Sequence, residues 1–396
     1  MNKKNGNVPI LCGGVDVGGT KIASALFDKE GEISARDKIA IDKGGGDAAA
    51  AQVADRIEAL ADSARRSGGH LAAVGISVPG IAYSESGRVW APNIPGWDRY
   101  PLLEKMRGHL PRAHVPIVLE SDRSAYVAGE AWRGAAAGAR DAVFLAVGTG
   151  IGAGIIADGR IIHGHEDIAG AVGWFALDPD FKPEYAAMGG FEAEASGNSV
   201  ARKAREKLAA GRPSAMIGLA AGDIGSVTAE TVAAAARAGD PLALEVVAET
   251  VTYLAMGVAN IVSIMNPEAV VLGGGLFQAA DLFLEPVRRE FRRWAQPLAA
   301  RSVRIELSAL GEDAGLYGCG FLAWETLGSS RAPGIPSRGG DGRCLEGPRC
   351  WRGGPAKRGG TVRTGSQGGR GARGNALSEA EERDPPRIGR RTKKKA

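Results

Sequence analysis

Three glycine-rich turns are the features of this sequence best suited to chemistry, because each follows an apolar run typical of a strand. Glycine lets backbone N–H groups approach phosphate closely, since no Cβ intervenes and positive φ is accessible. The GxxxxGK[ST] spacing of a P-loop is absent. The alternative for each turn alone is a hairpin without a ligand. The three turns together predict a nucleotide site, in which the hairpins of the first two turns face each other and hold the polyphosphate between them. The turns are Asp16-Val17-Gly18-Gly19-Thr20-Lys21, Gly148-Thr149-Gly150-Ile151-Gly152 and Gly273-Gly274-Gly275.

The side chains of the first turn add specific chemistry to its glycines. Thr20 supplies a hydroxyl donor and Lys21 a cation, both suited to phosphate oxygens. Asp16 precedes them, and its carboxylate could hold a magnesium ion through water.

A carboxylate pair lies between the first two turns, where Glu120-Ser121-Asp122 follows the apolar run 116–119. A carboxylate at a strand end suits a general base that takes a proton from an alcohol. The alternative is a helix N-cap, since Ser121 or Asp122 could cap a helix over residues 124–132. The local sequence by itself favours the cap.

Composition limits the class of protein. The chain has 396 residues, of which 44% are hydrophobic and 24% charged, enough for two or three domains with real cores. No unbroken apolar run is long enough for a transmembrane helix, and residues 1–8 lack the apolar stretch of a signal peptide. The four cysteines, at positions 12, 319, 344 and 350, show no paired spacing. We therefore expect a cytoplasmic protein without a membrane partner.

Charge separates the body of the chain from its tail. Residues 331–396 hold 17 Lys and Arg against 6 Asp and Glu, whereas the rest holds 32 against 39. The mildly acidic body is not expected to bind nucleic acid. The tail is rich in Gly, Arg and Pro and is predicted to be disordered. It could bind RNA through its terminal lysines, but with Trp351 as its lone aromatic residue a dispensable extension is favoured.

The turns require strands to position them, and apolar periodicity supplies two similar sets. The segments that begin at Val15 (VDVGGTKIASALFDKEG) and at Leu145 (LAVGTGIGAGIIADG) share one plan of strand, glycine hairpin, strand and polar turn. This repeat predicts a duplicated α/β domain, divided as residues 1–123 and 124–330, with hinge segments near Ser124 and Ser308. Strands are predicted over residues 9–17, 21–27, 33–39, 71–78, 115–119, 142–147, 153–157, 160–162, 269–272 and 303–307, and helices over 47–67, 197–210, 228–238 and 241–265.

Taken in order, the motifs resemble the ROK family (repressors, open reading frames, kinases), which includes bacterial sugar kinases. The resemblance covers residues 15–325 and rests on DVGGTK at Asp16, GISVPG at Gly75, APNIPGW at Ala91, the SD pair at Ser121, GTGIGAG at Gly148, AGAVGW at Ala169, FEAEASG at Phe191, NPEAVVLGGG at Asn266 and LGEDAGLYG at Leu310. It implies an α/β fold of two actin-like ATPase (ribonuclease H-like) domains around a cleft, and a homodimer.

The resemblance also implies an activity: transfer of phosphoryl from ATP, with Mg²⁺, to a hexose hydroxyl, glucose being the first choice. Asp122 falls on the family's catalytic base, which reverses the preference for a cap. Sugar contacts are implied for Asn93, Ser121, Asp122 and Glu192. Nucleotide contacts are implied for Gly18, Gly19, Thr20, Lys21, Gly148, Thr149, Gly150 and Gly274, and the third turn adds Gly273.

The chain departs from the family pattern at the sugar side. Ser121 replaces an asparagine, and the family's Gly-Glu-x-Gly-His becomes Gly170-Ala171-Val172-Gly173-Trp174, which removes a carboxylate and a histidine. The family's CxCGxxGCxE zinc motif is missing, because residues 185–192 of this chain contain no cysteine. We therefore predict no structural zinc.

Phe191 and Trp174 are expected to replace the metal by apolar packing. For Trp174 core packing is favoured over the alternative, a stacking platform for a sugar face.

Other functions remain open: a kinase for another hexose or an N-acylhexosamine, a non-catalytic sugar-binding protein, or a regulator of the same family. A regulator would need an N-terminal DNA-binding domain, and only about a dozen residues precede the first hairpin.

Overall fold

The computed structural model describes residues 8–110 and 115–327, and these belong to one compact unit. The tail predicted to be disordered, residues 331–396, lies outside the described residues, as do Cys344 and Cys350.

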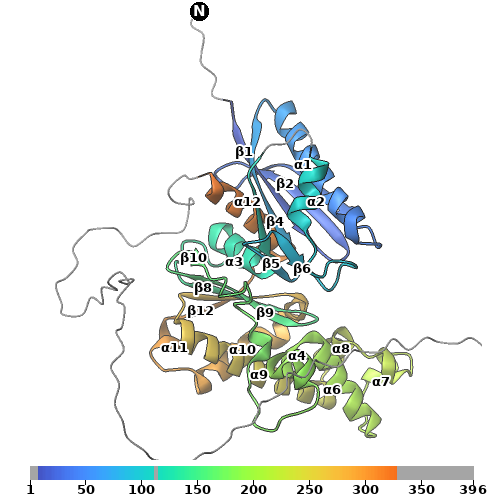
Figure 1. Ribbon diagram of the computed structural model, residues 1–396. Coiled ribbons are helices and arrows are strands. Elements are labelled where there is room, and N and C mark those ends of the chain that lie inside the picture. The colour runs from blue at the N-terminus through green and yellow to red at the C-terminus, as the bar shows by residue number, and fades with distance from the viewer. Residues whose placement is uncertain (1–7, 111–114, 328–396) are drawn as a thin grey trace, which may run out of the picture. The chain divides into compact units, whose positions relative to one another are not determined.

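The first sheet is built around the first glycine turn. Its strand order is β3-β2-β1-β4-β7, in which β2 and β3 run antiparallel to their neighbours while β4 and β7 run parallel to β1 (Figure 1). The carboxyl ends of β1, β4 and β7 therefore meet at one edge, where Asp16 and Ser121 lie. The bounds are β1 Ile10–Val17, β2 Lys21–Phe27, β3 Ile33–Ala40, β4 His70–Val78 and β7 Ile117–Ser121.

The second sheet repeats this topology strand for strand. Its order is β10-β9-β8-β11-β12, with β8–β9 an antiparallel hairpin and β11 and β12 parallel to β8. The predicted duplication is thus confirmed, because both the order and the directions of the strands recur. The bounds are β8 Ala142–Val147, β9 Ile151–Ala157, β10 Arg160–Ile161, β11 Ala269–Gly273 and β12 Arg304–Leu307.

Helices pack on each sheet, and their apolar side chains form one core with those of the strands. On the first sheet, α1 (Gly46–Arg66) and α2 (Leu102–His109) share a core with β1, β2 and β4. On the second, the main helices are α6 (Gly197–Ala209), α8 (Ala229–Arg237), α9 (Pro241–Met265) and α10 (Ala280–Trp294).

Helix α9 is long and apolar enough to cross a membrane by length and composition, but 61% of its apolar window is buried inside the protein. It is the central core helix of the second half, with β8 and β11 packed in the same cluster.

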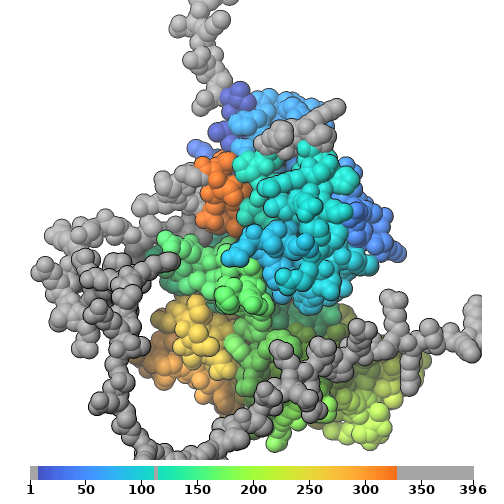
Figure 2. All heavy atoms as spheres, in the orientation of Figure 1, coloured from blue at the N-terminus to red at the C-terminus, as the bar shows by residue number. Residues whose placement is uncertain are grey.

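Two helices join the halves. Helix α3 (Asp122–Arg133) follows β7, and α12 (Ala314–Thr326) follows β12 but packs on β1 and β4 of the first sheet. In Figure 1 and Figure 2 the orange α12 accordingly lies with the blue N-terminal elements. The division at residue 123 stays a prediction, and the return of α12 to the first sheet was not foreseen in it.

Candidate active site

A cavity of about 1060 Å³ gathers most of the predicted site residues. Its lining combines the edge of the first sheet with the hairpin of the second, and it excludes Gly19, Thr20 and Ser121. The predicted residues that line it are Asp16, Gly18, Lys21, Asn93, Asp122, Gly148, Thr149, Gly150, Trp174, Glu192, Gly273 and Gly274.

All three glycine turns reach this cavity. The first is closed by the Gly18 N–H, which donates to the Lys21 carbonyl at 2.8 Å, and the second by the Gly148 N–H, which donates to the Gly150 carbonyl at 2.9 Å. In the third, Gly274 has φ +92°, and a Cβ there would lie 2.5 Å from the Val147 carbonyl oxygen. A side chain would thus be strained and in collision at Gly274.

The cap and the candidate base are different residues. Ser121 is the N-cap of α3, since its Oγ accepts from the Ser124 N–H at 3.3 Å, and the residue is buried. Asp122 is the first residue of the helix and lines the cavity. The structure therefore places Ser121 in a helix cap outside the cavity lining and leaves Asp122 lining the cavity. The sugar contact of Ser121 stays a prediction.

Burial shifts the pKa of the Asp122 carboxyl toward neutrality. It raises the pKa of this carboxyl to about 6, an effect opposed by the charge of Arg123 and reinforced by that of Asp16. A carboxylate with such a pKa is ionised at neutral pH yet basic enough to accept a proton from an alcohol.

Asp16 is held in place at the end of β1. The Ser77 hydroxyl donates to Asp16 Oδ1 at 2.5 Å, and burial raises the pKa of the carboxyl while Ser77 and Lys21 oppose that rise. In the part of the chain that the structure describes, no cluster of three or more His, Cys, Asp or Glu forms a metal site. Mg²⁺ in kinases binds through one or two carboxylates, together with waters and substrate phosphates. A single carboxylate such as that of Asp16 is therefore sufficient for a magnesium site of this kind.

Lys21 is already paired. Its Nζ lies 2.7 Å from Glu312 Oε2, and Lys38 approaches the same carboxylate at 3.6 Å. Binding of a polyphosphate would compete with Glu312 for this cation.

Glu192, a predicted sugar contact, is fixed by the second hairpin, because its Oε2 accepts from the Ile151 N–H at 2.8 Å. Burial raises the pKa of the Glu192 carboxyl. Asn93 lies against the first turn, where a Cβ on Gly19 would be 3.2 Å from the Asn93 Cβ.

The two aromatic residues behave differently from each other. Phe191 is fully buried and stacks on Phe175 with ring centroids 6.3 Å apart, as the packing prediction required. Trp174 is 59% exposed and lines the cavity, so the preference for core packing was wrong at this residue. It is the last residue of the 3-10 turn Val172–Trp174, in which Val172 and Gly173 are the buried residues.

Arg123 is a cavity residue that the sequence analysis missed. It follows Asp122 directly, and its stem crosses β9, since a Cβ on Gly152 would lie 2.6 Å from the Arg123 Cδ. Within the described residues its guanidinium has no hydrogen bond or ion pair. The signal was present in the sequence as a cation adjacent to the candidate base.

The comparisons with known proteins agree with this geometry. The family model described as the ROK family matches residues 12–326. A glucokinase of Halalkalibacterium halodurans is 34% identical over 313 residues, covering 78% of this chain and 93% of the relative.

Solved structures give the same result. The ROK family glucokinase from Streptomyces griseus, in complex with glucose and AMPPNP, has a TM-score of 0.63 and 32% identity and covers 80% of this chain and 99% of its own. The ROK hexokinase from Thermus thermophilus has a TM-score of 0.66 at 29% identity, with coverage of 80% and 99%. The predicted fold class, an α/β fold with two actin-like halves, is thereby confirmed.

Proposed function

This chain belongs to the ROK family, and we propose that it is an ATP-dependent sugar kinase that phosphorylates a hexose hydroxyl, with glucose as the first substrate to test. The observation that carries this proposal is the single cavity in which Asp122 faces all three glycine turns. The names of the relatives, glucokinases and a hexokinase, support the sugar kinase class.

In the proposed reaction, the glycine turns hold the polyphosphate of ATP while Asn93 and Glu192 hold sugar hydroxyls. Asp122 accepts the proton of the attacking hydroxyl, whose oxygen forms a bond to the γ-phosphorus as the bond to the β-phosphate oxygen breaks. The products are ADP and a hexose phosphate, which is glucose 6-phosphate when glucose is the substrate. Positioning and charge stabilisation supply most of the rate in such transfers.

Magnesium, bound to ATP and held near Asp16 through water, would neutralise charge on the phosphates. Arg123 offers a second, protein-borne cation beside the base. We further propose a cytoplasmic location and a homodimer, both by analogy with the family.

The test is ADP release with Mg·ATP across glucose, mannose, fructose, allose, N-acetylglucosamine and N-acetylmannosamine. Asp122→Asn should slow turnover by roughly 10²-fold or more. Asp55→Asn, an exposed residue of α1 outside the cavity, is the matched control and should keep the wild-type rate. If Asp122→Asn retains more than half of the rate, the assignment of the base fails.

A second substrate class is favoured by one observation. Ala171 and Trp174 line the cavity at the positions where the family pattern has a carboxylate and a histidine. A site that loses hydroxyl-binding groups relaxes or redirects its specificity, so an N-acylhexosamine is the runner-up substrate. No turnover with any sugar in the panel would instead favour a sugar-binding protein without catalysis.

A further inference from the structure

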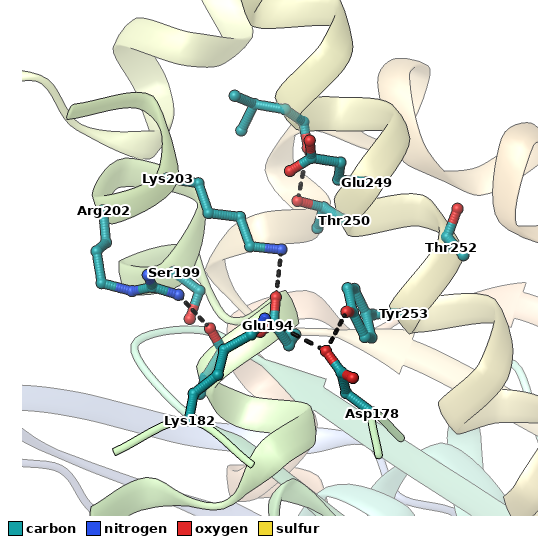
Figure 3. Close-up of polar contacts among 12 residues, drawn as sticks. Asp178, Lys182, Glu194, Ser199, Arg202, Lys203, Glu249, Thr250, Thr252 and Tyr253 are labelled. Carbon is teal, nitrogen blue, oxygen red and sulfur yellow. Dashed lines mark hydrogen bonds and ion pairs between the residues drawn. The ribbon is translucent and has the colours of Figure 1, made fainter. Parts of the chain in front are cut away.

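An ionic cluster surrounds Glu194, which lies two positions after the cavity residue Glu192 and next to the segment where the family pattern has its zinc motif. We call it the Glu194 cluster. It consists of Tyr185 and of five residues labelled in Figure 3: Asp178, Lys182, Glu194, Lys203 and Tyr253. Glu194 is 2% exposed and Lys203 is 8% exposed, so the central pair is removed from water.

Glu194 is the centre of the cluster and accepts from three donors. Its Oε1 lies 2.6 Å from Lys182 Nζ and 2.6 Å from the Tyr185 hydroxyl, and its Oε2 lies 2.6 Å from Lys203 Nζ. Burial acts to raise the pKa of the Glu194 carboxyl, but these three donors hold it below its ordinary value. The carboxylate is thus fully satisfied in its ionised form.

Asp178 is the second carboxylate of the cluster. Its Oδ2 lies 3.3 Å from Lys182 Nζ and accepts from the Tyr253 hydroxyl at 3.2 Å. The Lys203 ammonium also lies 4.8 Å from the centre of the Tyr253 ring. The cluster therefore binds three parts of the chain to one another: residues 178–194, α6 through Lys203 and α9 through Tyr253.

Two cavity residues lie close in sequence to these contacts. Trp174 precedes Asp178 by four positions, and Glu192 precedes Glu194 by two on helix α5 (Gly190–Ala195). The same helix is anchored to α6 by Ser199 Oγ, which donates to the Glu192 carbonyl at 2.7 Å, and by Arg202, which donates to the Ala193 carbonyl at 2.8 Å. A shift of this segment would move both sugar-facing side chains.

We propose that the Glu194 cluster is a metal-free ionic staple that positions Glu192 and Trp174 for the sugar, in place of a structural metal. Charges buried with several well-placed partners fix one geometry, because the loss of any partner leaves an uncompensated charge. The segment has no cysteine, and among the described residues no side-chain group suited to a metal forms there. This proposal rests on the proposed sugar kinase function.

The test uses Tyr185→Phe, which removes one hydroxyl and no charge, and Lys182→Met, which removes a partly exposed cation of the cluster. Both should raise the KM for the sugar about fivefold or more while the KM for ATP changes less than twofold. Lys207→Met is the control. Like Lys182, Lys207 is a partly exposed lysine that pairs with two carboxylates, but its partners, Glu245 and Glu249, lie outside the cluster. It should leave both KM values unchanged. A lowered melting temperature with an unchanged sugar KM in both cluster variants would overturn the positioning role.

A second readout does not depend on activity. Hydrogen–deuterium exchange of peptides within residues 186–195 should accelerate in Tyr185→Phe and Lys182→Met but not in Lys207→Met, whether or not the wild-type protein turns over a sugar. Equal exchange in all three variants would refute the staple independently of the kinase proposal.

Metal content tests the other half of the inference. Zinc below a tenth of an equivalent in the purified protein, with a melting temperature unchanged by EDTA, is expected. One equivalent of tightly bound zinc whose removal lowers the melting temperature would overturn the proposal that the Glu194 cluster takes the place of a structural metal.

Discussion

The proposed proton transfer depends on the pKa of one carboxyl group, that of Asp122. Asp122 combines burial with the nearby charges of Arg123 and Asp16, which together set its pKa at about 6. Because the base must be ionised, kcat/KM should fall as pH drops through about 6 and reach a plateau above it. A pH–rate profile of the wild-type enzyme checks this; a flat profile between pH 5 and 8 would contradict it. Asp16 shares the cavity, so the measured value belongs to the coupled pair.

The same shift makes a prediction about stability. The folded-state pKa of Asp122 lies above its ordinary value of 3.8, so the folded protein binds a proton more tightly than the unfolded chain. The contribution of this group is therefore present below 3.8 and lost as pH rises through about 6. At pH 8, Asp122→Asn should be more stable than wild type, by at most about 3 kcal/mol. Thermal unfolding at pH 8 measures it, and a less stable variant would show that the ionised carboxylate is stabilising.

Trp174 carries a prediction about substrate binding. Its indole is 59% exposed in the cavity wall, so truncation leaves no buried void. Trp174→Ala should raise the KM for the sugar about fivefold, the equivalent of about 1 kcal/mol of ring contact, and Trp174→Phe should restore most of the loss. Trp294→Ala, also exposed but on α10, is the control in the same steady-state assay. No change in the KM for Trp174→Ala would remove it from the sugar site.

At the scale of elements, helices α3 and α12 cross with their backbones in close approach. A Cβ on Gly318 would lie 1.8 Å from the Ala125 carbonyl oxygen, and one on Gly129 would lie 2.2 Å from the Ala314 carbonyl oxygen. Both collisions are with backbone, so a side chain can be accommodated only if the helices separate. The crossing therefore requires glycine on both helices.

Gly318→Ala should accordingly destabilise the protein by about 3 kcal/mol or more, as overpacking against backbone does. Gly108→Ala, in helix α2, meets nothing within 4 Å and should gain up to about 1 kcal/mol from helix propensity. Urea unfolding of the two variants compares them directly. Equal stabilities would mean that the helices adjust at no cost.

At the scale of the whole molecule, Glu130 ties together the two segments that join the halves. It is fully buried on α3 and accepts from the Ala309 N–H at 3.2 Å, the Leu310 N–H at 3.1 Å and the Ser308 hydroxyl, in the link between β12 and α12. It also accepts from the Ala135 N–H at 2.6 Å at the end of α3. The predicted hinge segments near Ser124 and Ser308 are thus joined by one carboxylate.

Glu130→Gln should cost about 2–4 kcal/mol, because the amide turns one acceptor into a donor that faces N–H groups. Glu285→Gln, at an exposed i,i+3 pair with Arg288, should change stability by less than about 0.5 kcal/mol. Chemical denaturation of both variants is the measurement. A loss below about 1 kcal/mol for Glu130→Gln would show that water replaces these contacts.

The sequence by itself determined most of the strands, the helices α1, α6, α8 and α9, and the repeated plan. The strands Lys21–Phe27 and Ala142–Val147 and the helix Pro241–Met265 have their predicted bounds, because apolar periodicity and turn residues act locally. The three glycine turns were also identifiable locally, since the need for close backbone approach is visible in residue type. Helix α12 was missed, because its apolar residues surround the whole helix and show no period.

Only the tertiary structure decided what those residues do together. It assigned the cap to Ser121, left Asp122 in the cavity lining and exposed Trp174. It also placed the Arg123 side chain in the cavity lining and returned α12 to the first sheet. It also assembled the Glu194 cluster from residues up to 75 positions apart. Burial, pKa and ion pairing depend on neighbours that are distant in sequence, so no local pattern can supply them.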